Sequence, residues 1–340
     1  MSELHLHVGF PKCASSYIQL FCLENARRLR EFGYIYPEVF TRRNGNATPL
    51  AMSLMDQVPE FYALRSKDYT DVLEFDKLMR EQYLMHVNEG SNLLLSSESF
   101  LKFSPRFVKE KFSRYFDNIH IYIVVRPQVA WVESHYAQRM HVGRYKGSIT
   151  DFIDKELVEN TMYGALFLDR LYKDWIKVFH KQNVHFLYIS RNSPPIEEQF
   201  LEVLEIDIDE DFDRLNRKIN AAINPAFLPV ILRLPTCSYV HHLELTNGLS
   251  KIWNEHPVEI KGSILSPDQR IDIQKRYLKS NKQFSRKNRH IPLEELCDLR
   301  EEVPYLPFDK LTELDELKPF YAKAEEVFQI VMQNYLEGSE

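Results

Sequence analysis

The sequence predicts a doubly wound α/β fold with a mainly parallel central sheet and a largely helical C-terminal annex. Up to about residue 211, short and nearly continuous apolar runs alternate with segments of helical spacing. Runs rich in β-branched and aromatic residues are typical of parallel strands that helices cover on both faces. From about Phe212 the strand pattern fades and prolines interrupt helical segments. We therefore expect a nucleotide-binding core at 1–211, and an annex at 212–340 that packs on it within the same domain.

Each expected element has its own signal in the chain. Four apolar runs predict interior strands, at residues 4–8, 92–96, 119–125 and 184–189. The stretch 33–37 stops at a proline and predicts an edge strand. Apolar residues at helical spacing predict helices at 15–32, 74–87, 129–139, 163–181 and 196–204.

Composition and charge exclude several classes of protein. The chain has 340 residues, of which 44% are hydrophobic and 13% aromatic, so it can bury a sizeable core and does not have a disordered composition. With 43 basic against 49 acidic residues, its net charge of −6 gives no general attraction to nucleic acid or anionic membranes. No apolar run reaches the roughly 18 to 20 residues of a membrane span, and the N-terminal MSELHLHVGF lacks a signal-peptide pattern. We expect a cytoplasmic protein.

The spacing of the four cysteines also fits a cytoplasmic protein. They lie at positions 13, 22, 237 and 297, with neither a CxxC pair nor the spacing of a zinc site. In a reducing compartment such cysteines are free thiols. We expect neither disulfides nor a structural metal.

The first chemical motif is the segment GFPKCASSYIQ, which directly follows the first expected strand. A strand that turns sharply into a helix directs the unpaired N–H groups of the helix toward the strand's carboxyl end, where an anion can bind. Lys12 adds a positive charge at this point, and the hydroxyls of Ser15 and Ser16 add hydrogen-bond donors. The segment therefore has the properties of a phosphate-binding loop, although an ordinary turn with Ser15 as helix cap has the same pattern.

This loop is not a Walker A motif. In that motif the lysine follows the second glycine and directly precedes the hydroxyl residue, and no GK[ST] occurs in the chain. The usual machinery of ATP or GTP hydrolysis is therefore disfavoured, and with it a kinase of the P-loop type.

The second motif follows the strand at 119–125. The strand ends in Arg126-Pro127, and the next helical stretch carries Ser134. Proline suits the first position of a helix, and seven residues make nearly two turns, so Ser134 returns to the face where the strand enters. A guanidinium and a hydroxyl together can hold a second phosphate. Without the first motif, an Arg in a surface ion pair and an exposed Ser would explain the pattern equally well.

Together the two motifs resemble those of the sulfotransferases that use 3′-phosphoadenosine 5′-phosphosulfate (PAPS), and most closely the bacterial carbohydrate-type branch. GFPKCASSYIQ is similar to the 5′-phosphosulfate loop of this family, and IYIVVRPQVAWVESHYAQ is similar to its 3′-phosphate segment. The strand order matches over about the first 200 residues. Ala14 departs from the family, where glycine is common, and Ser15 replaces a common threonine.

The resemblance implies a P-loop NTPase-like sulfotransferase fold and a set of roles. Lys12 would hold the phosphosulfate and stabilise charge on the leaving oxygen. The loop residues Pro11, Cys13, Ala14, Ser15 and Ser16 would bind the 5′-phosphate, while Arg126 and Ser134 would bind the 3′-phosphate. PAPS would be the co-substrate and 3′-phosphoadenosine 5′-phosphate (PAP) the product, with no metal. The acceptor would be a small molecule or a glycan.

The base that activates the acceptor hydroxyl is predicted to be Glu98. It ends the expected strand at 92–96, and the carboxyl ends of strands in an open α/β sheet border the ligand crevice. Carbohydrate-type sulfotransferases are similar in using a glutamate as this base. The alternative is that Glu98 caps the following helix or pairs with a surface lysine. His135 and His141 are alternative bases, whereas His5 and His7 are expected to be packing residues.

Weaker candidates lie further along the chain. Arg191 follows the strand at 184–189 and is a candidate contact to the nucleotide. The segment 279–290 is basic and without acids, which fits either a lid over the nucleotide or a solvated helix face. The sequence leaves open the acceptor, the oligomeric state and whether the protein is an enzyme or a nucleotide-binding module that has lost transfer.

Overall fold

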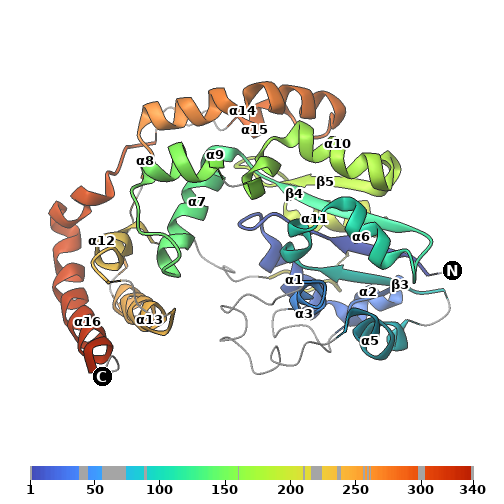
Figure 1. Cartoon of the computed structure of the whole chain (residues 1–340), viewed down its shortest axis with the longest axis horizontal. Coiled ribbons are helices and arrows are strands. Elements are labelled where there is room, and N and C mark those ends of the chain that lie inside the picture. The colour runs from blue at the N-terminus through green and yellow to red at the C-terminus, as the bar shows by residue number, and fades with distance from the viewer. Residues whose placement is uncertain are drawn as a thin grey trace. The chain divides into compact units, whose positions relative to one another are not determined.

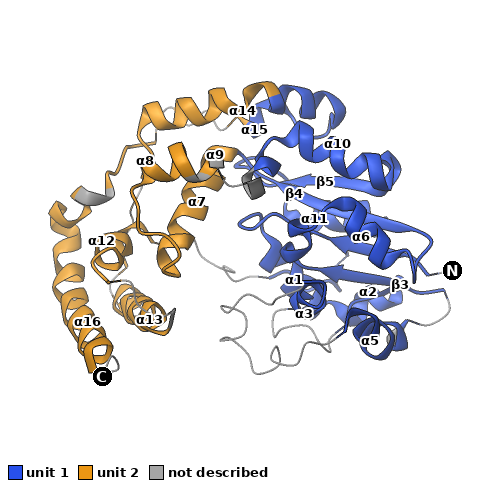
Figure 2. Cartoon of the chain, in the orientation of Figure 1, with its two compact units in different colours: residues 1–127, 164–220, 280–296 blue, residues 128–163, 221–279, 297–340 orange. Residues whose placement is uncertain are grey.

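The computed structural model describes most of the chain. The described residues are 2–37, 45–55, 74–87, 90–159, 161–209, 211–215, 224–235, 239–255, 257–258, 260, 262–297 and 303–337. They form two compact units, shown in different colours in Figure 2. Unit 1 comprises residues 1–127, 164–220 and 280–296, and unit 2 comprises residues 128–163, 221–279 and 297–340.

A five-stranded parallel sheet forms the centre of unit 1 (Figure 1). Its strands are β1 (Leu4–His7), β2 (Tyr34–Ile35), β3 (Asn92–Ser96), β4 (Ile119–Val125) and β5 (Val184–Tyr188). Their order is β2-β3-β1-β4-β5, and each neighbouring pair is parallel. Strands are thus confirmed at all five expected places, as is the α/β fold class. The position of β5 corrects one expectation, because it was expected to be an interior strand and lies at the second edge of the sheet.

The strand order changes direction between β1 and β4. The chain leaves β1 toward β2 at one edge of the sheet, and it leaves β4 toward β5 at the other edge. In open α/β sheets, ligands bind outside the carboxyl ends of neighbouring strands whose connections diverge in this way. The loops after β1 and β4 therefore lie at the position where a ligand is expected.

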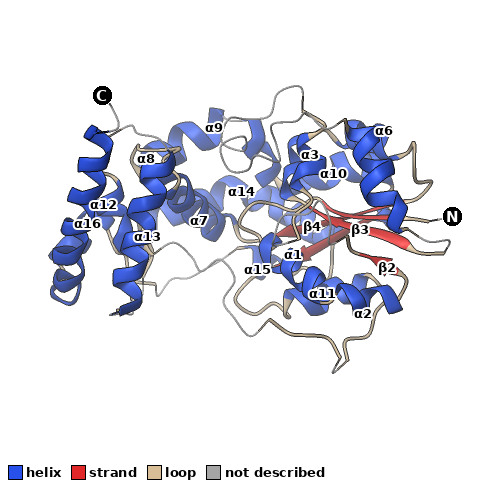
Figure 3. Cartoon of the chain, turned by 90° about the horizontal axis from the view of Figure 1, so that it is seen from below, coloured by secondary structure: helices blue, strands red, loops and turns tan. Residues whose placement is uncertain are grey.

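Helices cover both faces of the sheet. In Figure 3, α1, α2 and α11 lie on one side of the strands, and α6 and α10 lie on the other. The helices of this unit are α1 (Ser15–Glu24), α2 (Ala26–Glu31), α3 (Thr48–Met52), α5 (Phe75–Leu78), α6 (Pro105–Phe112), α10 (Leu168–Phe179), α11 (Ile196–Val203) and α15 (Leu293–Leu296). This covering explains why β1 and most of β4 are buried on both faces and apolar on at least one.

Several expected helices are shorter or less regular than predicted. The segment expected at 15–32 divides at Asn25, whose side chain donates to the Phe21 carbonyl and to that of Asp213. The segment expected at 74–87 contains one α-helical turn, followed by a π-helix (Met79–Tyr83) and a 3₁₀ turn (Leu84–His86). Helical spacing thus located these elements but not their ends, because contacts distant in sequence decide where a helix stops.

Unit 2 is helical in its described part. Its helices are α7 (Gln128–His141), α8 (Ile149–Asp151), α9 (Leu157–Glu159), α12 (Leu228–Ile231), α13 (Tyr239–Glu255) and α16 (Lys318–Glu337), and α14 (Pro267–Lys287) runs from this unit into unit 1. Its apolar core comes mainly from α12, α13 and α16, with Phe227, Leu249 and Phe320 among the buried side chains. The strand-like pairing described here is a single bridge between Ser263 and Tyr305. The expected boundary at 211/212 stays a prediction, and the units place residues 128–163 with the helical part.

None of the described helices combines the length and the apolar composition that crossing a bilayer requires.

A buried histidine in unit 2 predicts a loss of stability in mild acid. The side chain of His242 is 1% exposed, and its two ring nitrogens have no hydrogen-bond partner among the described residues. Burial, together with the nearby Lys146, His141 and His241, lowers its pKa from 6.5 to about 4. Because the unfolded chain binds the proton more readily, stability should be complete above pH 6.5 and fall as the pH drops toward 4.

For each pH unit below 6.5 in that range, we expect the unfolding free energy to fall by about 1.4 kcal/mol because of this histidine. Urea unfolding at pH 7.5 and pH 5 measures the loss in the wild type. The variant His242→Gln should lose roughly 2 kcal/mol less between these pH values, since 1.5 units below pH 6.5 are involved. An equal loss in both proteins would show that His242 does not carry this pH dependence.

Candidate active site

The loop after β1 has an unusual backbone. Gly9, Lys12 and Ala14 have φ angles of 41°, 66° and 55°, which lie in the left-handed region. A Cβ atom on Gly9 would lie 2.7 Å from Oγ of Ser15, so a larger residue does not fit there. Lys12 and Ala14 adopt this conformation at a cost, because they carry Cβ atoms. Strained residues of this kind are often found at binding sites.

This backbone presents the start of α1 without a side-chain cap. Ala14 is the N-cap, and its methyl side chain cannot accept a hydrogen bond from the N–H groups of the helix. Ser15 is the first helical residue. The Ser15 hydroxyl instead donates to the Phe10 carbonyl, at 3.2 Å. Ser15 is therefore not the helix cap, and this part of the alternative interpretation is wrong. The N–H groups of the first turn face the carboxyl end of β1, where they favour an anion.

Lys12 and Arg126 lie together beyond the carboxyl ends of β1 and β4. Nη1 of Arg126 donates to the carbonyl of Lys12 at 2.7 Å, which joins the end of β4 to the loop after β1. Both side chains are half-buried. Burial lowers the pKa of Lys12, and the adjacent guanidinium lowers it further. Two cations at one strand edge form a locally positive site in a chain whose net charge is negative.

Glu98 lies beside the same loop. It directly follows β3 and begins a 3₁₀ helix (Glu98–Lys102), for which the side chain of Ser97, and not Glu98, provides the cap. The carboxylate of Glu98 is close enough to Lys12 to raise that residue's pKa, against the larger effects of burial and Arg126. The structure thus brings together Lys12, Arg126 and Glu98, which come from three neighbouring strands.

Two buried amides orient the Glu98 carboxylate. Nε2 of Gln19 donates to Oε2 of Glu98 at 3.1 Å, and Nδ2 of Asn46 donates to the same oxygen at 3.2 Å. Gln19 and Asn46 are 0% and 5% exposed. Among the described residues, Oε1 of Glu98 accepts no hydrogen bond, so both amides act on Oε2 alone.

Sequence reasoning missed these two amides. Gln19 stands at the end of the first motif but carries no signal of its own, and Asn46 comes from a loop outside both motifs. The loop can approach α1 because Gly45 has a φ angle of 78° and lacks a Cβ, which would lie 2.5 Å from the Gln19 carbonyl. A glycine before a polar residue is too common a pattern to have predicted this contact.

The cysteine within the loop is not a nucleophile. Cys13 is buried and free, and burial raises its pKa to about 12, so it stays protonated at neutral pH. Cys22 and Cys297 are also buried and form no disulfide with another described residue, and Cys237 lies outside the described residues.

Other predicted residues lie away from this group or in unit 2. Arg191 is exposed in the loop after β5, the edge strand. Ser134 is half-buried in the second turn of α7, in unit 2. His135 is buried and stacks on Trp131 at a ring distance of 4.4 Å, which is the environment of a packing residue. His141 is half-buried at the end of α7.

The basic segment 279–290 lies mainly in α14. Its five basic side chains are exposed: Lys279, Lys282, Arg286, Lys287 and Arg289. Between them, Phe284 is buried against Tyr172 and Phe186, and Ser280 donates to Asp169 at 2.6 Å. This pattern is that of an amphipathic helix with a solvated basic face.

Comparisons with known proteins give one structural similarity. No family model matches the chain, and no curated protein matches it. Among solved structures, a sulfotransferase from Alicyclobacillus acidocaldarius is similar over 83% of this chain and 94% of its own, with 13% sequence identity and a TM-score of 0.45. The fold and the group formed by Lys12, Arg126 and Glu98 therefore rest on the contacts of this chain alone.

Proposed function

We propose that the chain is a PAPS-dependent sulfotransferase that transfers a sulfuryl group to a hydroxyl of a carbohydrate or glycoconjugate. The observation that carries the proposal is the contact of Arg126 with the loop that holds Lys12, beyond the carboxyl ends of β1 and β4. Arg126 disfavours the charged form of Lys12, and a bound anion would favour it. A nucleotide with anionic groups at both its 3′ and 5′ positions suits such a pair.

The loop would bind the phosphosulfate end of the donor. The N–H groups at the start of α1 and the hydroxyl of Ser16 would hold the 5′-phosphate, with the Lys12 ammonium beside the bridging oxygen. Arg126 would hold the 3′-phosphate, and we assign Ser134 to the same group on the basis of the sequence resemblance. Arg191 remains a proposed nucleotide contact on the same basis.

Transfer needs only positioning, charge and one proton acceptor. The acceptor oxygen attacks sulfur in line as the bond from sulfur to the bridging oxygen breaks, and the electron pair of that bond stays on the 5′-phosphate of PAP. Lys12 stabilises this negative charge. Oε1 of Glu98 takes the proton of the acceptor hydroxyl, while Gln19 and Asn46 hold Oε2. No step requires a metal.

Nucleotide binding offers the first test. We expect PAP to raise the melting temperature far more than ADP does, because only PAP carries a 3′-phosphate. A ligand present at 100 times its Kd adds about 2.7 kcal/mol to the unfolding free energy. The variant Arg126→Gln should lose the preference for PAP over ADP, measured by thermal shift and calorimetric titration.

A matched control is Arg106→Gln, which removes an exposed arginine from α6. It should bind PAP like the wild type. Equal stabilisation of the wild type by PAP and ADP would contradict a 3′-phosphate site at Arg126. Once binding is established, labelled PAPS incubated with a panel of sugars, lipids and phenols identifies the acceptor class, and labelling of phenols alone would contradict a carbohydrate acceptor.

A further inference from the structure

A second cluster of polar side chains lies at the amino ends of β1 and β4. Glu3 directly precedes β1, His5 lies within β1, and His120 lies within β4. His5 and His120 are direct partners in the parallel register of these strands. The cluster is thus at the amino ends of β1 and β4, whereas Lys12 and Arg126 follow their carboxyl ends.

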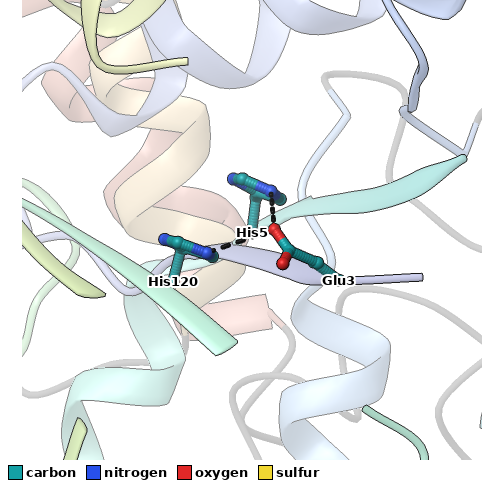
Figure 4. Close-up of side chains that lie close together, drawn as sticks. All are labelled: Glu3, His5 and His120. Atoms are coloured by element: carbon teal, nitrogen blue, oxygen red, sulfur yellow. Dashed lines mark ion pairs between the residues drawn. The ribbon is translucent and has the colours of Figure 1, made fainter. Parts of the chain in front are cut away.

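The three side chains converge on one point. Oε2 of Glu3 lies 3.2 Å from Nε2 of His120 and 3.7 Å from Nε2 of His5. Each of the three residues offers a ligand atom, and these atoms lie within 4.8 Å of one another. Figure 4 shows the Glu3 carboxylate directed toward both imidazole rings.

The nitrogen of His5 at this point is a buried ligand atom. His5 is 5% exposed, and its Nε2 has no hydrogen-bond partner among the described residues. Its other nitrogen, Nδ1, lies 2.7 Å from the Tyr122 hydroxyl. The tautomer that carries its proton on Nδ1 and donates it to Tyr122 leaves a lone pair on Nε2, which is the form that binds metals.

The carboxylate is oriented in a similar way. Nδ2 of Asn118 donates to Oε1 of Glu3 at 2.8 Å, so this oxygen is held while Oε2 faces the histidines. Metal-binding histidines and carboxylates in proteins are commonly fixed by such outer hydrogen bonds. Tyr122 and Asn118 would supply them here.

We propose that Glu3, His5 and His120 form a binding site for a divalent transition metal such as Zn²⁺. Two imidazoles and one carboxylate are a ligand set that zinc accepts with a water in the fourth position. Ligand atoms of a tetrahedral zinc site lie about 3.4 Å apart, given bonds of about 2.0 to 2.1 Å. The two distances from Glu3 are already close to this value.

Binding requires one movement. The rings of His5 and His120 are stacked, with centroids 4.7 Å apart and planes inclined by 6°. A metal lies in the plane of each imidazole that binds it, so the rings must rotate out of the stack toward a common point. His120 is half-buried, and its ring also stacks on that of His185 at a centroid distance of 5.8 Å, so its rotation must give up that contact as well. The bound metal would then join β1 to β4 at their amino ends.

The test is to treat the full chain with EDTA and then to titrate it with Zn²⁺ in an isothermal calorimeter. We expect one tight site, and an affinity at least tenfold lower in Glu3→Gln and in His120→Asn. Tyr122→Phe removes only the outer partner of His5 and should lower affinity about tenfold. His180→Asn, which removes an exposed histidine outside the cluster, should bind like the wild type.

Co²⁺ distinguishes the proposed ligands from cysteines. The wild type should give visible bands of nitrogen and oxygen ligation without a thiolate charge-transfer band, and Glu3→Gln should lose them. Unchanged Zn²⁺ affinity in Glu3→Gln and His120→Asn, or a thiolate band in the wild type, would overturn the proposal. Circular dichroism of each variant without metal establishes that it folds. Glu3→Gln keeps an oxygen that accepts from Asn118, so the proposal is judged on this variant if His120→Asn is unfolded.

Discussion

Lys12→Met is expected to lower kcat for sulfuryl transfer by about 100- to 1000-fold, the effect of removing a group that stabilises charge in a transition state. Methionine keeps most of the length and apolar volume of the side chain and removes only its charge. Turnover of labelled PAPS with a saturating acceptor measures the loss. Since burial and Arg126 make the charged form of Lys12 costly, the variant should be at least as stable as the wild type.

The matched control is Lys181→Met, which removes an exposed lysine outside the site. It should leave kcat unchanged. A Lys12→Met enzyme with wild-type turnover would show that the ammonium does not act on the leaving group, and a variant that is unstable would show instead that Lys12 supports the loop.

Glu98→Gln is expected to lower kcat by about 100- to 10,000-fold, the range for loss of a general base. Glutamine retains an oxygen that accepts from Gln19 and Asn46, so the local hydrogen bonds survive while the proton acceptor is lost. Binding of PAP should not change, which separates an effect on chemistry from one on folding. Transfer rates and PAP titration are measured on the same preparation.

This pair of measurements also separates an enzyme from a nucleotide-binding module. If the wild type binds PAP but transfers no sulfate to any acceptor in the panel, the module is the better description. Undiminished turnover in Glu98→Gln would remove Glu98 as the base and favour His141, the half-buried alternative in unit 2. Histidine and glutamate bases differ in the pH dependence of kcat, which provides an independent readout.

Much of unit 1 was predictable because its signals are local. A buried parallel strand must be apolar along its length, so the runs at 92–96 and 119–125 located β3 and β4 at their observed bounds. The turn after β1 was predictable because a glycine and a proline end the first apolar run directly before a helical pattern. Parallel strands share one carboxyl edge, which is why Glu98 could be placed near Lys12 from the sequence.

Other features depend on pairings that no local pattern encodes. Asn46 reaches Glu98 only because Gly45 lets its loop pass close to α1. His5 and His120 become neighbours through the register of β1 and β4, and each alone resembles an ordinary packing histidine. No metal site was therefore predicted here, and His5 was expected to be a packing residue.

The amino-acid sequence by itself determined the class of fold, the positions of the strands and the loop that carries Lys12, since these follow from burial and backbone preferences of adjacent residues. Only the tertiary structure decided that Arg126 binds the backbone of this loop, that two buried amides hold Glu98, and that Glu3 faces two histidines. The physical reason is that these contacts join segments far apart in the chain, and their geometry exists only when strands pair in one register and helices pack on them.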